Sequence, residues 1–255
     1  MTEKLRIADL PEDARAYLRQ AYDRLREKLT GTVTTHGLTK GLSTAVARER
    51  IALMTQEMAP IYTAMDAAQT PVACARGCGC CCSLTVDVSP DEVFALVAYL
   101  DETLSDEDLA ALKARAADAD AQGHGLEPLV RHRKRIMCPV QDPVTKACLG
   151  HPARPTPCQG YVSIDLASCE ADHAAPPQRV HRPIASGILT DLVSGTRNEV
   201  LAAFGAPAQS LELTAALVSA WKDPGAESRW LAGERVLVDA TSYAPPDENN
   251  PVGGA

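Results

Sequence analysis

The sequence predicts a mainly α fold, in which helices surround a loop-rich middle segment. Hydrophobic residues make up 45% of the 255 residues but aromatic residues only 4%, and alanine and leucine supply most of the apolar content. Such a core suits helices that pack closely on small side chains better than a β-sandwich, which favours aromatic and β-branched residues. All nine cysteines lie between Cys74 and Cys169, so helical ends flank a cysteine-bearing middle.

The chain divides into four parts by composition. We expect a helical N-terminal arm at 1–70, a cysteine-cluster domain at 71–175, a helical C-terminal part at 176–243 and a disordered tail at 244–255. The tail is rich in Pro, Asn and Gly, which do not support a packed core. A chain of this length can bury a core without a bound ion or disulfides.

Two helices are expected in the N-terminal arm. Apolar residues recur at helical spacing from Leu18 to Leu29, after a helix-start signal at 9–12. Glycines at 31, 37 and 41 interrupt this pattern, and a second helix follows from about 42 to 65. Pro60 is expected to kink this helix or end it early, because proline removes a backbone hydrogen bond.

The middle segment begins with a short strand and two capped helices. Residues 84–88 alternate like a strand, and Ser89, Pro90 and Glu92 form a helix start with a capping box. Ser105 begins another helix in the same way. The charged residues of both helices are expected on solvated outer faces.

A small hairpin is expected at 136–149, with a turn at 142–146 and with Cys138 and Cys148 near its two ends. Prolines at 152, 155 and 157 then predict an irregular path up to Cys158. Helical patterns return after His181 and continue to Trp221.

The charge and the start of the chain constrain its partners and location. A net charge of −8 argues against a nucleic-acid partner, because a general nucleic-acid binder needs a positive surface. The first residues show no signal peptide, and the longest apolar run, at 93–100, is too short to span a bilayer. We therefore expect a cytoplasmic protein without a membrane partner; the sequence identifies no protein partner. Cytoplasmic thiols stay reduced, which favours metal ligation over disulfides.

Five cysteines fall within residues 74–82, and four more are spaced widely after them. Zinc and iron prefer thiolate ligands in intracellular sites, and such ligands come in close pairs joined by tight turns. Gly77 and Gly79 allow the chain to bend around an ion. The sequence thus predicts a helical domain around a loop-rich cysteine metal centre with a small hairpin. The expected ligands of zinc or iron are Cys74, Cys78, Cys81, Cys82, Cys138, Cys148, Cys158 and Cys169.

Cys81 and Cys82 are adjacent, which bears on the number of metal atoms. In an extended segment their side chains point to opposite sides, and one tetrahedral ion would bind both only with a strained backbone. The adjacency therefore indicates two nearby ions or a multinuclear centre, or else one of the two is not a ligand. Eight thiolates suit two zinc ions, or an iron–sulfur cluster with further ligands. Cys80 is expected to stand outside the ligand set.

The order of these motifs resembles a known family. The matching stretch runs over about residues 70–172 and includes the cluster at 74–82, the helix start at 86–92, Cys138-Pro139, Cys148, Arg154-Pro155, Cys158 and Tyr161. It resembles the CxxCxxCC cysteine-cluster family, also called the YkgJ family, which is described as a zinc- or iron-chelating domain. One departure is Gln159, where the family often has arginine. A related group, the flagellin lysine methylases, implies that the fold supports methyl transfer with an iron–sulfur cluster.

Two functions follow from the cysteines and the resemblance. The first is a metal-binding protein that chelates zinc or iron through clustered thiolates, in a structural, storage or sensing role. The alternative is an iron–sulfur-dependent enzyme such as a protein methyltransferase. No substrate, acid–base pair or nucleotide loop is evident, so the sequence leaves open whether the chain is an enzyme.

Other patterns support weaker hypotheses. The spacing of Cys74, Cys78 and Cys81 also suits radical S-adenosylmethionine enzymes, but the chain lacks the alternating strands and helices of their barrel. No histidine pairs with a particular cysteine as a catalytic base, although His151 or His173 is an alternative metal ligand. The basic run at 131–135 is expected to be a solvated helix face or to balance the thiolate charge, and we prefer the second.

Overall fold

The computed structural model describes residues 10–241 and confirms a mainly α protein. The predicted disordered tail lies outside the described residues, and the fourfold division of the chain stays a prediction. Within the described part, the α-helices are α1 (Glu12–His36), α2 (Leu42–Ala67), α3 (Pro90–Thr103), α4 (Asp106–Gly123), α5 (Pro128–Arg133), α6 (Thr156–Gly160), α7 (Leu166–Ala174), α8 (Ile184–Ala203), α9 (Leu213–Lys222) and α10 (Ala226–Leu231).

Short elements complete the fold. They are the 3-10 helices η2 (Cys80–Ser83), η3 (His151–Ala153) and η4 (Val238–Ala240), and the strands β1 (Asp87–Val88) and β2 (Leu211–Glu212), which pair antiparallel. The predicted strand at 84–88 is therefore confirmed only at its end. No helix between residues 10 and 241 has the length and apolar character needed to cross a membrane.

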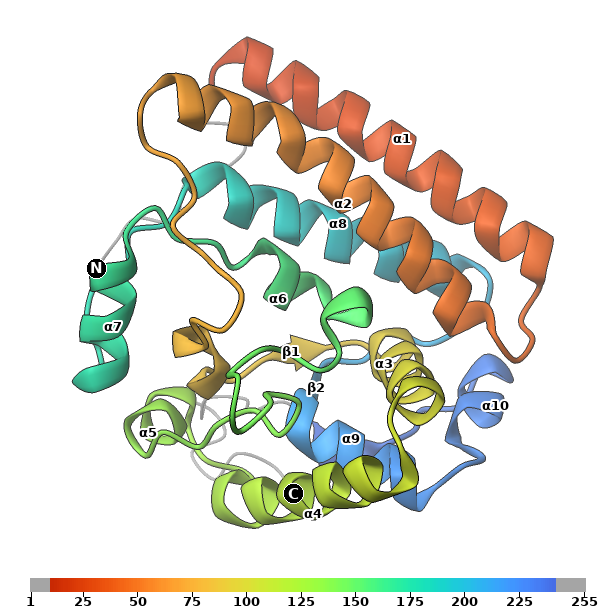
Figure 1. The fold of residues 1–255 in the computed structure, drawn as a ribbon. Coiled ribbons are helices and arrows are strands. Elements are labelled where there is room, and N and C mark those ends of the chain that lie inside the picture. Colours follow the sequence, from red (N-terminus) through yellow and green to blue (C-terminus); the bar gives the residue numbers. More distant parts are fainter. Residues whose placement is uncertain (1–9, 242–255) are drawn as a thin grey trace, which may run out of the picture.

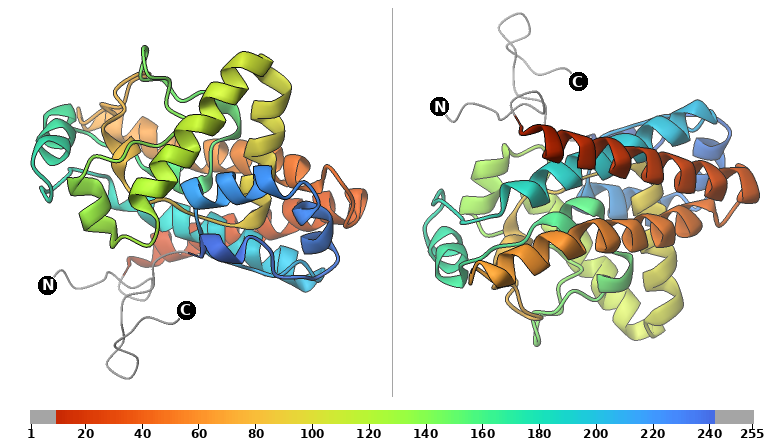
Figure 2. Two further views of the ribbon diagram at one scale, coloured as in Figure 1. Left: turned by 90° about the horizontal axis from the view of Figure 1, so that it is seen from below. Right: turned by 90° about the horizontal axis from the view of Figure 1, so that it is seen from above.

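Three long helices form one side of the molecule. Helices α1, α2 and α8 pack against one another, and Figures 1 and 2 show them as one layer. Gly31 does not interrupt α1 as predicted, because the helix continues to His36. Gly37, with a φ of 63°, ends α1, and Gly41, with a φ of 96°, precedes α2. Both glycines adopt the left-handed backbone that other residues avoid.

Pro60 lies inside α2 and does not end it, because the helix extends to Ala67. The early end that we allowed for is therefore wrong. The buried residues of α2 stop at Met58, so the turn that contains Pro60 lies on the more exposed part of the helix.

The other side of the molecule contains α3, α4, α9 and α10. Helix α9 packs against both α3 and α4, and α10 packs against α3, where the rings of Phe94 and Trp230 lie 6.0 Å apart. The predicted capping box of Ser89 and Glu92 is confirmed at the start of α3. One hydrophobic core runs from Leu18 in α1 to Ala240 in η4, so both sides share it.

The charged start of α3 is not solvated as expected. Asp91 and Glu92 are buried, and both pair with Arg197 of α8, while Glu92 also lies 3.8 Å from Arg50 of α2. Buried carboxylates persist only where cations and hydrogen bonds compensate for lost hydration. This charge cluster therefore joins α2, α3 and α8 through the interior.

The predicted hairpin forms as a tight turn with little regular strand. A single antiparallel bridge joins Gln141 and Cys148, and Oδ1 of Asp142 accepts the N–H groups of Val144 and Thr145. This Asp side chain mimics a backbone turn. The turn thus brings Cys138 and Cys148 close together, as the sequence predicted.

The proline-rich path to Cys158 is more regular than predicted. Pro152 occupies the first turn of η3, and Pro157 occupies the first turn of α6. Proline suits this position because the first N–H groups of a helix have no partner within the helix. The prolines therefore start short helices, and Cys158 lies within α6.

Candidate metal centre

Five cysteines line one small cavity at the edge of the molecule. The cavity, hereafter the outer thiol cavity, measures about 20 Å³. A space of this size holds roughly one water-sized particle, which is also the size class of a single metal ion. Its cysteines are Cys74, Cys78, Cys80, Cys81 and Cys169.

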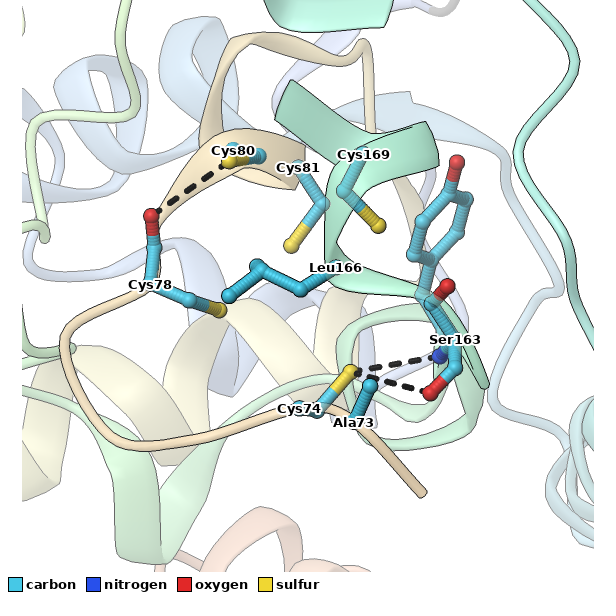
Figure 3. Close-up of a pocket in the computed structure, with 9 residues that line it drawn as sticks. Ala73, Cys74, Cys78, Cys80, Cys81, Ser163, Leu166 and Cys169 are labelled. Carbon is cyan, nitrogen blue, oxygen red and sulfur yellow. Dashed lines mark hydrogen bonds between the residues drawn. The ribbon is translucent and has the colours of Figure 1, made fainter. Parts of the chain in front are cut away.

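Figure 3 shows how the thiols are arranged. The sulfur atoms of Cys78, Cys81 and Cys169 lie around the side chain of Leu166, and Cys74 lies beside Ser163. The thiol of Cys80 instead points to the carbonyl oxygen of Cys78, at 3.5 Å. Cys80 therefore lines the cavity while its thiol is engaged with the backbone, and its place outside the ligand set stays a prediction.

Two glycines give the cluster its path. Gly77 and Gly79 have φ angles of 88° and 60°. A Cβ atom at Gly77 would lie 2.8 Å from the carbonyl oxygen of Thr145, and one at Gly79 would lie 2.2 Å from Nε2 of Gln141. The chain therefore needs glycine at both positions, for its backbone angle and for its close approach to the turn after Cys138.

Cys74 is fixed by an adjacent backbone segment. The N–H of Ser163 donates to Sγ of Cys74 at 3.2 Å, and the N–H of Ala73 donates to the carbonyl oxygen of Ser163 at 2.8 Å. Burial raises the pKa of Cys74, and the Ser163 N–H opposes that shift because it stabilises the thiolate. A sulfur that accepts an N–H is prepared for the anionic form that binds metal.

Cys138, Cys148 and Cys158 form a second group, hereafter the inner thiol group. Burial raises the pKa of all three thiols. Their mutual proximity adds to the shift, because the charge of Cys158 raises the pKa of Cys138 and the charge of Cys148 raises that of Cys158. These three predicted ligands are thus near enough to affect one another's ionisation, and none of them lines the outer thiol cavity.

Cys81 and Cys82 connect the two groups. They lie in η2, so the extended backbone that we assumed for them is wrong. A hydrogen bond with Cys82, and then burial, raises the pKa of Cys81, whose charge in turn raises the pKa of Cys158. The N–H of Cys138 donates to the carbonyl oxygen of Cys82 at 2.7 Å. All eight predicted ligands therefore lie in one region, divided into an outer and an inner part.

Arg154 supplies the positive charge that the sequence assigned to the basic run. Burial raises the pKa of Cys148 and Cys158, and the guanidinium of Arg154 opposes both shifts. The described contacts of the basic run are elsewhere: Arg131 donates to Thr214, and Arg135 donates to the carbonyl oxygens of His173 and Ala174. None of these printed contacts is with a thiol, and our preferred role for the run stays a prediction.

Tyr161 forms a wall of the outer thiol cavity. The guanidinium carbon of Arg182 lies 3.8 Å from the centre of the Tyr161 ring, which is a cation–π contact. Burial raises the pKa of Tyr161 to about 12, so its hydroxyl stays protonated at neutral pH. The wall is thus rigid and uncharged, beside thiols that must ionise to bind metal.

The cavity fits a metal in its donor chemistry. Within residues 10–241, no three His, Cys, Asp or Glu side chains are placed for joint coordination of an ion. Coordination would therefore require the thiols around the cavity to turn toward one point. Sulfur donors in this number match the ligand preference of zinc and iron, and the cavity has room for one ion.

Sequence reasoning missed a polar network that includes Ser83, the residue after Cys82. Ser83 contacts His132, and His132 contacts Asp172. These residues lie 49 and 40 positions apart in the chain, so no local spacing could have paired them. The only sequence signal was the presence of His132 itself.

Comparison with known proteins gives no relative. No family model, curated protein or solved structure matches this chain. The resemblance to the cysteine-cluster family therefore rests on the quoted motifs alone.

Proposed function

We propose that this protein binds zinc or iron through clustered cysteine thiolates. The proposal rests mainly on the outer thiol cavity, where five thiols surround a space suited to one ion. Cys74, Cys78, Cys81 and Cys169 are the proposed ligands there. Cys82, Cys138, Cys148 and Cys158 are proposed to hold a second metal atom in the inner part. The resemblance to a zinc- or iron-chelating family supports the same chemistry.

The state of the cysteines supports metal binding over disulfide formation. All nine cysteines are unpaired in the structure. We propose a cytoplasmic location, as the sequence predicts, because thiols stay reduced there. Metal binding there would release thiol protons, because the thiolate is the ligand.

We propose single ions as the occupants, because the outer thiol cavity holds roughly one water-sized particle in this structure. The role that follows is structural, storage or sensing. An iron–sulfur enzyme such as a protein methyltransferase is the alternative, and a coloured cluster would identify it.

Purification without oxygen tests the proposal. The full chain is purified anaerobically, its metals are measured by elemental analysis, and its absorption spectrum is recorded. We expect zinc or iron at one to two atoms per chain. A brown protein that absorbs at about 400 nm and releases sulfide with acid would instead favour the iron–sulfur enzyme. A colourless, metal-free chain that stays folded with a chelator would overturn the proposal.

A further inference from the structure

Helix α7 carries Cys169 to the outer thiol cavity but has little apolar anchorage. Its buried residues are Ser168 and Asp172, both polar, and Leu166 is 40% exposed. Figures 1 and 2 show α7 at the edge of the molecule. Since apolar burial is the main force that fixes a helix on a protein, other contacts must hold α7 in place.

Those contacts are a buried chain of three polar residues, hereafter the polar latch: Ser83, His132 and Asp172. Oγ of Ser83 lies 2.8 Å from Nδ1 of His132, and Nε2 of His132 lies 3.0 Å from Oδ2 of Asp172. All three side chains are buried. The polar latch therefore joins η2, which carries Cys81, to α7 through α5. Oγ of Ser83 also lies 3.3 Å from Nδ1 of His173, a direct contact with α7 beside the latch.

The proton positions in the polar latch follow from the acceptors. An ionised Asp172 only accepts, so Nε2 of His132 carries a hydrogen toward it. In neutral His132 the other ring nitrogen is an acceptor for the hydroxyl of Ser83, whose one hydrogen is also within reach of the carbonyl oxygen of Cys80, at 3.2 Å. Oδ1 of Asp172 also accepts the N–H of Gln178, at 2.7 Å. Each member of the latch thus has a partner, and loss of Asp172 removes the bonds that it accepts from His132 and from the N–H of Gln178.

The polar latch has the composition of a hydrolase triad but not its accessibility. Ser83 is 0% exposed and does not line the outer thiol cavity. A nucleophilic serine must reach its substrate, as it does in hydrolases. The network therefore has a structural role, and Ser83 is not a nucleophile for a substrate.

The C-terminal end of α7 is held in the same polar way. Nε of Arg135 donates to the carbonyl oxygen of His173 at 3.0 Å, and Nε of Arg133 donates to that of Pro176 at 3.3 Å. Arginine suits the last carbonyls of a helix, which lack partners within it. These bonds are exposed to water, whereas the polar latch is buried.

We propose that Ser83, His132 and Asp172 are positioning residues that hold Cys169 over the outer thiol cavity, and that α7 is the part that opens when metal enters or leaves. The inference rests on the proposed metal binding. Cys74, Cys78 and Cys81 lie outside α7, so opening would remove one thiol and leave three. The outer metal is thus exchangeable, whereas the inner thiol group lies on other elements.

Alkylation of the metal-free, reduced full chain tests the latch directly. The rate at which iodoacetamide modifies each cysteine is measured by peptide mass spectrometry. In Asp172→Ala we expect Cys169 to react at least about tenfold faster than in the wild type, because a hydrogen bond to a charged group is lost. The reaction rates of Cys148 and Cys158 should not change. Asp120→Ala is the matched control, because Asp120 pairs with His124 at the same 3.0 Å on an exposed surface. Its rates should match those of the wild type.

Metal release supplies the second readout. The zinc-loaded protein is mixed with excess EDTA, and Asp172→Ala should lose its outer zinc at least about tenfold faster than wild type. Unchanged Cys169 alkylation in Asp172→Ala and in the milder Ser83→Ala would overturn the latch, whether or not metal binds. If Asp172→Ala does not fold, the alkylation rate of Cys169 in Ser83→Ala tests the proposal. Failure of the wild type to bind any metal would overturn the proposed function but leave the alkylation result valid.

Discussion

Nη1 of Arg197 lies 2.5 Å from Oε1 of Glu92, and both side chains are almost completely buried. The same carboxylate accepts the N–H of Thr156 at 2.7 Å. Thr156 begins α6, which carries Cys158. The buried ion pair therefore supports the position of the inner thiol group as well as the packing of α3 on α8.

Replacement of Arg197 should destabilise the protein strongly. Arg197→Met would leave Asp91 and Glu92 buried with insufficient positive charge, which costs about 3–5 kcal/mol of unfolding free energy. Urea denaturation followed by circular dichroism measures the loss. Arg229→Met is the control, because Arg229 pairs with Asp223 on the surface, where such pairs contribute little to stability. Equal effects of the two substitutions would contradict this role for the buried pair.

The acid stability of the protein should depend on Glu92. Burial alone would raise its pKa, but the charges of Arg197 and Arg50 outweigh burial and hold that pKa well below 4.5. A lowered pKa contributes stability above pH 4.5 that is lost as the pH falls through the lowered value. Burial raises the pKa of Asp91, so Asp91 opposes this loss in acid.

Urea midpoints measured from pH 7 down to pH 3 test this dependence. The wild type should lose stability below about pH 4.5, and Glu92→Gln should show a smaller loss over the same range. Glu107→Gln, on the exposed first turn of α4, is the control and should behave as the wild type. An equal acid slope in wild type and Glu92→Gln would show that Glu92 does not carry the effect.

Alanine at Gly77 should weaken metal binding. The left-handed backbone and the 2.8 Å approach to the Thr145 carbonyl force the loop to move, and Cys74 and Cys78 move with it. Gly31→Ala is the control, because Gly31 is helical with open space around it, and it should gain about 0.5–1 kcal/mol of stability. Competition for zinc against a chelator measures affinity in both variants, and equal affinities would contradict the prediction.

Neighbouring cysteines should behave differently on substitution. Cys81→Ser should lower the bound metal, because Cys81 lies between the outer and inner groups. Cys80→Ser should retain it, because the Cys80 thiol points to the carbonyl oxygen of Cys78. Elemental analysis of the two anaerobically purified variants makes the comparison. Loss of metal in Cys80→Ser but not in Cys81→Ser would show that Cys80, and not Cys81, is a ligand.

Local signals in the sequence predicted local structure well. The capping box of Ser89 and Glu92 and the N-cap of Ser105 need only neighbouring residues, and both are present in the structure. The turn at Asp142 depends likewise on its own side chain. The gathering of the cysteines has another basis: it joins distant segments, and it was predicted from the ligand preference of zinc and iron and from the resemblance.

Contacts between distant segments were not predictable. Asp91 looked like a surface residue because nothing near it in the sequence shows that Arg197 lies against it. The polar latch joins three separate elements, and the basic run binds the end of a helix that follows it by about 40 residues. The sequence gives the charge of each side chain, but it does not show which partner compensates that charge once the side chain is buried.

X-ray absorption at the metal edge tests the central claim most directly. It identifies the atoms bound to the metal in the anaerobically purified full chain and needs no substitution. We predict a first shell of sulfur at about 2.3 Å around zinc, the distance of a zinc–thiolate bond. A shell made only of nitrogen and oxygen, at about 2.0–2.2 Å, would contradict the claim that the clustered thiolates hold the metal.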